Sequence, residues 1–243
     1  MMLLGLAVTL ALCVTGSNAF TSPTDTTQVR RLQPFGSSLS KSEYDDLCGL
    51  LGNNTTLTLL YKSSSAGTAY GDMLACVENK PNVVIVIRNA QYAFGAFISE
   101  GIRLPAFNST TGMMPRWHGY ESDVWFFSLA GHYENATKIE IDQQSQDVLV
   151  ASQIWGNPMA PCFGGLVPRY NARVVVGRDL SLGRSLSGGC WPLSTDDIRK
   201  GRQSTDANDV PEGYMGVTDE NGNALLGGSR QFIADEIEIF AVK

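Results

Sequence analysis

The segment NVVIVIR at residues 82–88 is the part of the sequence that most constrains the fold. Apolar, mostly β-branched residues occupy consecutive positions, a pattern that predicts a strand buried on both faces. The segment YAFGAFIS at residues 92–99 follows after a short connection and predicts a second strand. Gly95 lies inside this second strand, where a glycine indicates a bulge or a close approach of another backbone. Both strands are therefore expected in the interior of a layered β fold.

Strand-like segments dominate the rest of the chain. They are residues 56–62, 123–129, 136–142, 147–154, 172–178 and the C-terminal stretch 230–243. The helical segments are residues 40–52 and 68–77. Ser40 and Glu43 have the spacing of a capping box, which begins a helix. Residues 100–122 and 181–213 are expected to be loops. Because strands outnumber helices and do not alternate with them, the expected fold is mostly β (α+β), a two-layer antiparallel β-sandwich with a few flanking short helices.

Composition and charge exclude some classes of partner. The chain has 243 residues, of which 43% are hydrophobic and 17% charged, enough for one sizeable globular domain. Its formal net charge is -6, and its basic residues occur singly or in short pairs. A chain without a basic cluster is poorly suited to bind a phosphate backbone, so no nucleic-acid partner is expected.

The N-terminus predicts entry into the secretory pathway. An apolar run, Leu3–Val14, is followed by small residues that end at Ala19. This pattern predicts a signal peptide over residues 1–19, because the run is too short to span a bilayer of about 30 Å. Residues 20–39 begin with Phe20 and are Ser/Thr-rich, which predicts a linker or a plastid transit segment. The expected location is therefore outside the cell or in the secretory-pathway lumen, with the plastid as the alternative, and no transmembrane segment is expected in the mature chain.

Cysteines and glycosylation motifs agree with an oxidising compartment. Four cysteines remain after the signal peptide, and they are candidates for up to two disulfides of undetermined pairing: Cys48, Cys76, Cys162 and Cys190. The N-x-S/T acceptor pattern for N-linked glycans occurs at Asn53, Asn54, Asn108 and Asn135. We therefore expect a secreted or luminal glycoprotein, with a domain over residues 40–243.

Catalytic and metal motifs are absent from the sequence. The two histidines, His118 and His132, lack the spacing of a zinc site and are expected in loops or at the surface. No histidine follows Cys190, as a papain-type cysteine nucleophile would require, and G-x-S-x-G does not occur. The glycine-rich stretches lack the phosphate-binding patterns. The expectation is therefore a protein that is not an enzyme and has no cofactor or bound metal.

Two glutamates of the C-terminal stretch, Glu236 and Glu238, are the candidate site. Residues two apart on a strand share a face, which places their carboxylates about 6–7 Å apart. Such a pair could serve acid/base catalysis or bind a hard cation, and it is equally typical of a solvated strand face. Our interpretation is an interaction surface, with both acids at the wet rim of a strand that enters the core. A carboxylate-dependent hydrolase is an alternative.

Aromatic residues leave a second alternative open. The side chains that could form a sugar-stacking platform are Trp117, Tyr120, Trp125, Trp155 and Trp191. Trp125 lies in an apolar strand and is expected in the core instead. A carbohydrate-binding β-sandwich is therefore an alternative to a protein-binding module.

In their order along the chain, these segments resemble the TLDc domain family. The motifs include Leu59–Tyr61 (LLY), Phe94–Phe97 (FGAF), Phe126–Leu129 (FFSL), Cys162–Gly165 (CFGG) and Asp235–Phe240 (DEIEIF). The resemblance runs from about Ser40 to the end of the sequence.

The resemblance implies a two-layer β-sandwich without an established catalytic centre. The family is associated with oxidation resistance, and some members bind the vacuolar proton pump from the cytosolic side. The predicted signal peptide and the long segment 193–213 distinguish this chain from cytosolic members. The expected function is therefore a non-catalytic interaction or protective module in the secretory pathway or an organelle lumen, with a protein or glycan partner that the sequence does not identify.

Overall fold

The segment expected to be buried on both faces is an interior strand of an antiparallel sheet. The computed structural model describes residues 33–52, 54–77, 79–104, 117–151, 172–183 and 196–243. In this part of the chain the first sheet has six strands, in the order β1 (Leu57–Lys62), β12 (Glu236–Val242), β2 (Val83–Asn89), β3 (Tyr92–Ile98), β5 (Val124–Ala130) and β6 (Thr137–Glu140). All neighbouring strands are antiparallel.

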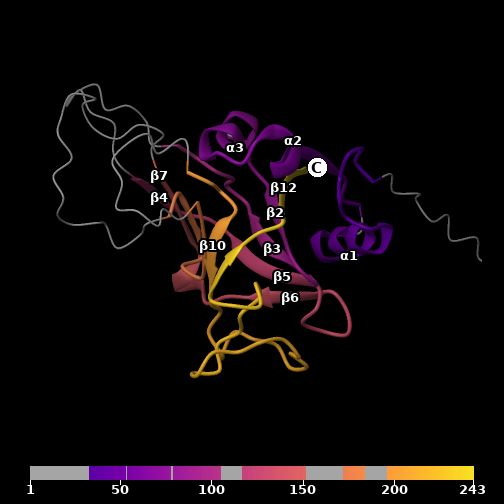
Figure 1. Cartoon of the computed structure of the whole chain (residues 1–243), viewed down its shortest axis with the longest axis vertical. Helices are drawn as coiled ribbons and strands as arrows, with labels where there is room; N and C mark the ends of the chain where they lie inside the picture. The colour runs from indigo at the N-terminus through magenta and orange to yellow at the C-terminus, as the bar shows by residue number, and fades with distance from the viewer. Residues whose placement is uncertain (1–32, 53, 78, 105–116, 152–171, 184–195) are drawn as a thin grey trace, which may run out of the picture. The chain divides into compact units, whose positions relative to one another are not determined.

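A second antiparallel sheet forms the other layer (Figure 1). Its six described strands lie in the order β11 (Gln231–Ile233), β10 (Lys200–Gln203), β9 (Leu180–Leu182), β8 (Val174–Val176), β7 (Asp147–Ala151) and β4 (Trp117–Glu121). The helices are α1 (Lys41–Leu51), α2 (Ser63–Ala66), α3 (Tyr70–Val77) and the 3₁₀ turn η1 (Gln143–Ser145). The expected fold class, a mostly β two-layer sandwich with a few short helices, is confirmed.

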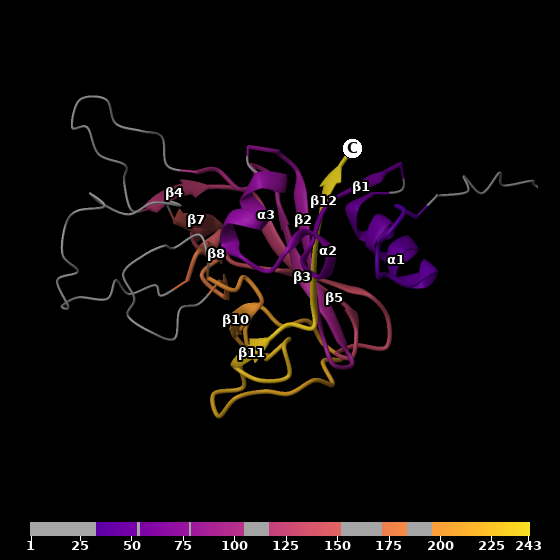
Figure 2. The same cartoon turned by 45° about the horizontal axis from the view of Figure 1, so that its top comes forward.

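The alternation of β2 side chains explains its continuous apolar sequence. Ile85 and Ile87 belong to the large core between the two sheets, together with residues of β7 and β8. Val84 and Val86 point the other way, into a second cluster with Tyr44 and Leu47 of α1. The helix and the second sheet thus lie on opposite sides of the first sheet (Figure 2). The strand is apolar throughout because both of its faces are covered.

Two local predictions from the sequence are confirmed. The capping box at the start of α1 is complete, since the Ser40 hydroxyl accepts from the Glu43 amide and the Glu43 carboxylate accepts from the Ser40 amide. Gly95 lies at a close approach of two strands: a Cβ there would lie 1.8 Å from the Ile85 carbonyl oxygen and 2.7 Å from the Phe127 ring. Both the capping box and the glycine within the strand are local features of the sequence, so they could be predicted from it.

Three short strands of the second sheet, β4, β9 and β10, were not predicted, whereas β7 and β8 lie within predicted strand segments. β4 lies within the expected loop 100–122, and β9 and β10 lie within or at the edge of the expected loop 181–213. The C-terminal stretch 230–243 is also two strands instead of one. Gln231–Ile233 pairs in the second sheet and Glu236–Val242 pairs in the first. Such short strands are held by partners distant in sequence, so they leave little periodic pattern of their own.

No helix among the described residues is long and apolar enough to cross a membrane. The expected signal peptide, residues 1–19, and most of the expected linker lie outside the described residues.

Candidate functional site

β12, the strand that carries Glu236 and Glu238, lies between β1 and β2 in the first sheet. Ile237 and Ile239 point into the core between the sheets. The two glutamates share the opposite face with Phe240, which packs in the cluster beneath α1. Pairing on both sides and burial on both faces fix this backbone, so the glutamates sit on a rigid support.

Glu236 caps the short helix α2 from a neighbouring strand. The residue before this helix, Lys62, makes no side-chain cap. The Glu236 carboxylate instead accepts a hydrogen bond from the Ser64 amide at 2.9 Å and bonds from the Ser63 and Ser64 hydroxyls. The Ser63 hydroxyl in turn accepts from the Ile237 amide at 3.0 Å. Glu236 therefore satisfies a free amide at the start of α2, as an N-cap residue would.

These hydrogen bonds also determine the charge state of Glu236. Burial by itself would raise the pKa of this carboxyl, but the bonds from Ser63 and Ser64 and the nearby Lys62 ammonium hold the pKa below its usual value. Glu236 is therefore a carboxylate at neutral pH. A general acid needs a raised pKa, so the electrostatics point away from that role.

Glu238 is buried, with 1% of its side chain exposed. One of its oxygens accepts a hydrogen bond from the Ser38 amide at 2.7 Å, and the other accepts from the Ser37 hydroxyl at 3.1 Å. The Lys62 ammonium lies 3.5 Å from Glu238 and 4.0 Å from Glu236, and it donates to the Gly36 carbonyl at 2.8 Å. The expectation that both acids lie at a wet rim is wrong for Glu238, because residues 36–38 cover it.

A second ion pair holds the beginning of α1 in the same region. The Arg88 guanidinium, at the end of β2, donates to both Glu43 oxygens at 3.1 and 3.0 Å. Burial would raise the pKa of Glu43, but the bonds from Arg88 and Ser40 lower it below its usual value. Arg88 also donates to the Ser38 carbonyl at 3.4 Å. Bidentate pairs of this kind fix geometry as well as charge.

We call this set of residues the N-terminal clamp. Its members are Lys62, Arg88, Glu43, Glu236 and Glu238, together with the serines and backbone of residues 36–40 and 63–64 that they contact. Leu39 is also buried, in the cluster beneath α1. The domain therefore includes residues 36–39, a few residues earlier than the expected boundary at Ser40. The candidate carboxylates are used to join the two ends of the domain.

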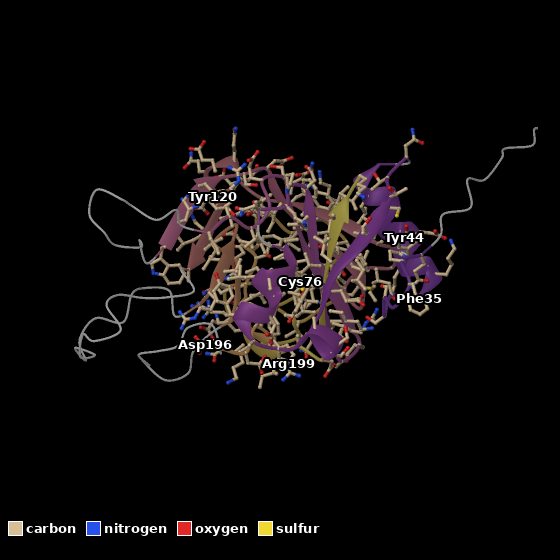
Figure 3. All side chains as sticks on the ribbon, turned by 90° about the horizontal axis from the view of Figure 1, so that it is seen from above. Phe35, Tyr44, Cys76, Tyr120, Asp196 and Arg199 are labelled. Atoms are coloured by element: carbon tan, nitrogen blue, oxygen red, sulfur yellow. The ribbon has the colours of Figure 1, made fainter. Side chains whose placement is uncertain are left out.

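Among the residues that the structure describes, the other predicted site residues do not gather around these glutamates. Cys76 on α3 packs toward the core between the sheets (Figure 3), Cys48 lies in the core under α1, and the two are not bonded to each other. Cys162 and Cys190 lie outside the described residues, so the pairing of the cysteines stays a prediction. Among the glycosylation motifs, Asn54 and Asn135 are exposed, whereas Asn53 and Asn108 lie outside the described residues.

The aromatic side chains are dispersed. Trp125 is 5% exposed, stacks on Phe97 and lies under the Lys138 ammonium, which is 4.6 Å from its ring centroid. Trp117 and Tyr120 are half-buried on β4, and the Tyr120 hydroxyl donates to the Gly101 carbonyl at 2.6 Å. The expected core position of Trp125 is confirmed. Two further members of the proposed platform, Trp155 and Trp191, lie outside the described residues.

Two titratable groups have shifted pKa values without any signal in the sequence. His132, expected in a loop or at the surface, is fully buried. Asp179, at the turn between β8 and β9, has its pKa raised to about 7 by burial and by the nearby Asp209 and Asp206 carboxylates, against a hydrogen bond from Thr205. No sequence motif could have indicated either group, since both depend on which distant segments pack around them.

The raised pKa of Asp179 predicts a pH-dependent stability. The unfolded carboxyl titrates near its ordinary value of 3.8 and the folded one near 7, so the folded state holds more protons between these values. The contribution of Asp179 to stability should therefore fall as the pH rises from about 4 to about 7. Asp179→Asn should increase the free energy of unfolding at pH 8 by about 1–2 kcal/mol. This value is smaller than the full pKa shift would give, because solvent screens a partly exposed carboxylate. Urea denaturation against pH measures this effect.

Asp123→Asn is the matched control for Asp179→Asn, because Asp123 is exposed. This control should change stability by less than about 0.5 kcal/mol at every pH. If Asp179→Asn is no more stable than the wild type at pH 8, burial does not oppose ionisation of Asp179.

The fold and the clamp together define a class of protein: a two-sheet β-sandwich module in which the buried Glu238 of the last strand binds residues 37–38 at the start of the domain. The model of the TLDc domain matches residues 36–243, and the chain belongs to the TLDc family. The match begins at the residue whose carbonyl accepts from Lys62 in the N-terminal clamp. A comparison with curated proteins found no match.

Proposed function

We propose that this protein is a non-catalytic TLDc module that acts in the secretory-pathway lumen or an organelle lumen, as an interaction or protective domain. The observation that carries the proposal is the structural use of the one carboxylate pair that the sequence offers as an active site. Glu236 caps α2 and Glu238 is buried against residues 37–38. Membership of the TLDc family supports a module of this kind.

The luminal location is supported by sequence features. Residues 1–19 have the pattern of a signal peptide, and the exposed side chains of Asn54 and Asn135 lie in acceptor motifs for N-linked glycans. A link to oxidation resistance is the role that the family suggests. In a lumen, the domain would perform this role through luminal or extracellular partners.

The deciding experiment is to express the full chain with a C-terminal tag, to locate it, and to sequence the N-terminus of the mature protein. The expected product begins at Phe20, after the predicted signal peptide, and shifts in mass on deglycosylation. An Asn135→Gln variant shows whether this motif is used. An uncleaved, cytosolic product would contradict the luminal location.

The non-catalytic role has its own test. A broad hydrolase panel and a glycan array should both give no signal with the purified, mature protein. Hydrolysis that disappears in folded Glu236→Gln and Glu238→Gln variants would establish the carboxylate-dependent enzyme instead. Glycan binding that is lost when Trp117 is changed to Ala would establish the carbohydrate-binding alternative.

A further inference from the structure

His132 is stacked against two tyrosine rings that come from distant segments of the chain. It follows β5 and is fully buried. Its ring is stacked on Tyr92 of β3, with 4.6 Å between centroids and 18° between planes. The ring is also stacked on Tyr214, with 5.8 Å between centroids and 8° between planes. Tyr214 belongs to residues 213–217, which we call the latch segment.

The latch segment is held closed by contacts to His132. The Met215 amide donates to the His132 carbonyl at 2.8 Å. Gly216 lies so close that a Cβ there would be 2.7 Å from the His132 ring. At the end of the segment, the Val217 carbonyl accepts from the Leu225 amide at 2.8 Å and from the Tyr214 hydroxyl at 2.9 Å. Stacking of Tyr214 on a neutral ring is therefore part of what keeps the segment in place.

The surroundings of His132 cannot stabilise a positive charge well. Its Nδ1 lies 2.8 Å from the buried Ser128 hydroxyl of β5, and its buried Nε2 has no well-formed hydrogen bond within the described residues. The titratable groups stacked on the ring are Tyr92 and Tyr214, and Tyr133 packs edge-on against Tyr214. Burial raises the pKa values of Tyr133 and Tyr214 to about 12. The remaining neighbours are the edge of the Phe94 ring and the carbonyls of Leu226 and Ala130.

We propose that His132 is an acid-sensitive latch: the neutral imidazole holds residues 213–217 closed, and its protonation releases them. The structure shows the closed state. In it the ring is buried against aromatic side chains, and its Nε2 has no hydrogen-bond partner among the residues that the structure describes. In the open state the ring would reach water, where the charged form is stable. Opening would also uncover the rings of Tyr133 and Tyr214.

The size and sign of the effect follow from linkage. Burial lowers the pKa of the enclosed His132 to about 4, and the carbonyls of Leu226 and Ala130 offset this only in part. The open ring should titrate near the ordinary histidine pKa of 6.5. The closed state is therefore fully favoured above that pH and loses its advantage as the pH falls from about 6.5 to about 4. Between pH 7.5 and 5, the equilibrium constant for opening should rise about 30-fold.

Hydrogen exchange of the full mature chain tests the latch. The amides of Met215 and Leu225 report on opening because both are bonded across the latch segment. After correction for intrinsic exchange, their protection should fall about 10- to 30-fold from pH 7.5 to pH 5. The amides of β12 paired with β2 serve as the reference and should keep their protection. Unchanged protection of Met215 and Leu225 would overturn the proposal.

Two variants separate titration from packing. His132→Phe preserves an aromatic ring against Tyr92 and Tyr214 but cannot be protonated, so its latch segment should be insensitive to pH. Tyr133→Phe removes a hydroxyl that, like the His132 Nε2, is buried without a hydrogen-bond partner among the described residues, and it should keep the wild-type response. A His132→Phe protein that still opens in acid would overturn the proposal.

If this variant does not fold, an NMR titration of wild-type His132 decides: a pKa of 6 or above in the closed state contradicts the latch. The latch does not depend on the proposed luminal function, so either can fail alone.

Discussion

Replacing Gly95 with Ala is expected to lower the free energy of unfolding by about 3 kcal/mol or more. The added Cβ would lie 1.8 Å from the Ile85 carbonyl oxygen and 2.7 Å from the Phe127 ring. The first of these atoms belongs to the backbone of β2, the strand that pairs with β3 on one side and β12 on the other. No side-chain rotation can relieve that contact, so two interior strands would have to separate. Urea denaturation of the purified variant measures the loss, with soluble yield as a first indication.

Gly49→Ala provides the matched control for this prediction. Gly49 lies within α1, and a Cβ there would meet no heavy atom within 4 Å. Alanine is the better helix former, so this variant should be more stable than the wild type by up to about 1 kcal/mol. A Gly95→Ala protein that loses less than about 1 kcal/mol would show that β2 and β3 can separate at low cost, contrary to the close approach in the structure.

Glu238→Ala is expected to lower the free energy of unfolding by about 2–3 kcal/mol. The substitution leaves the Ser38 amide without its acceptor and removes one of the two carboxylates beside Lys62. This expected loss lies at the lower end of the range for breaking a buried ion pair. Lys62 is partly exposed, and it keeps its contacts with Glu236 and the Gly36 carbonyl. Glu238→Gln keeps an acceptor for Ser38 and should lose less. Chemical denaturation measures both variants.

The N-terminal clamp also predicts where the Glu238→Ala protein becomes labile. Residues 36–40 should be cleaved faster by a protease than in the wild type, because Glu238 is what binds Ser37 and Ser38. Glu140→Ala is the control. Glu140 forms an ion pair with Lys138 on the surface, and such pairs contribute about 0–1 kcal/mol. Equal effects of the two substitutions would contradict a structural role for the buried carboxylate.

Much of the first sheet could be predicted from the sequence because its signals are local. The apolar run of β2 indicated a strand covered on both faces, and Gly95 indicated the close approach of a neighbour. The capping box at Ser40 and Glu43 marked the start of α1. The pattern of strands and the order of the family motifs led to the sandwich and to the TLDc family, which the structure and the family match confirm. Each of these features depends on residues close together in the chain.

The candidate site was predicted less well because it depends on residues that are far apart in the chain. Glu236 and Glu238 were correctly placed on a strand and on a shared face, but their sequence could not show what would cover them. The partners of Glu238 are Ser37 and Ser38, at the other end of the domain. The same holds for β10, whose pairing with β9 and β11 joins segments that have little strand pattern of their own.

The sequence by itself determined the layers of this protein and the family to which it belongs, because hydrophobic periodicity and turn chemistry are local properties of a chain. Only the tertiary structure decided which polar groups are buried. Whether Glu238 is a clamp or an exposed acid, and whether His132 is an enclosed ring or a surface histidine, depends on contacts between segments far apart in sequence. Desolvation and hydrogen bonding at those contacts set the charge and the role of each group.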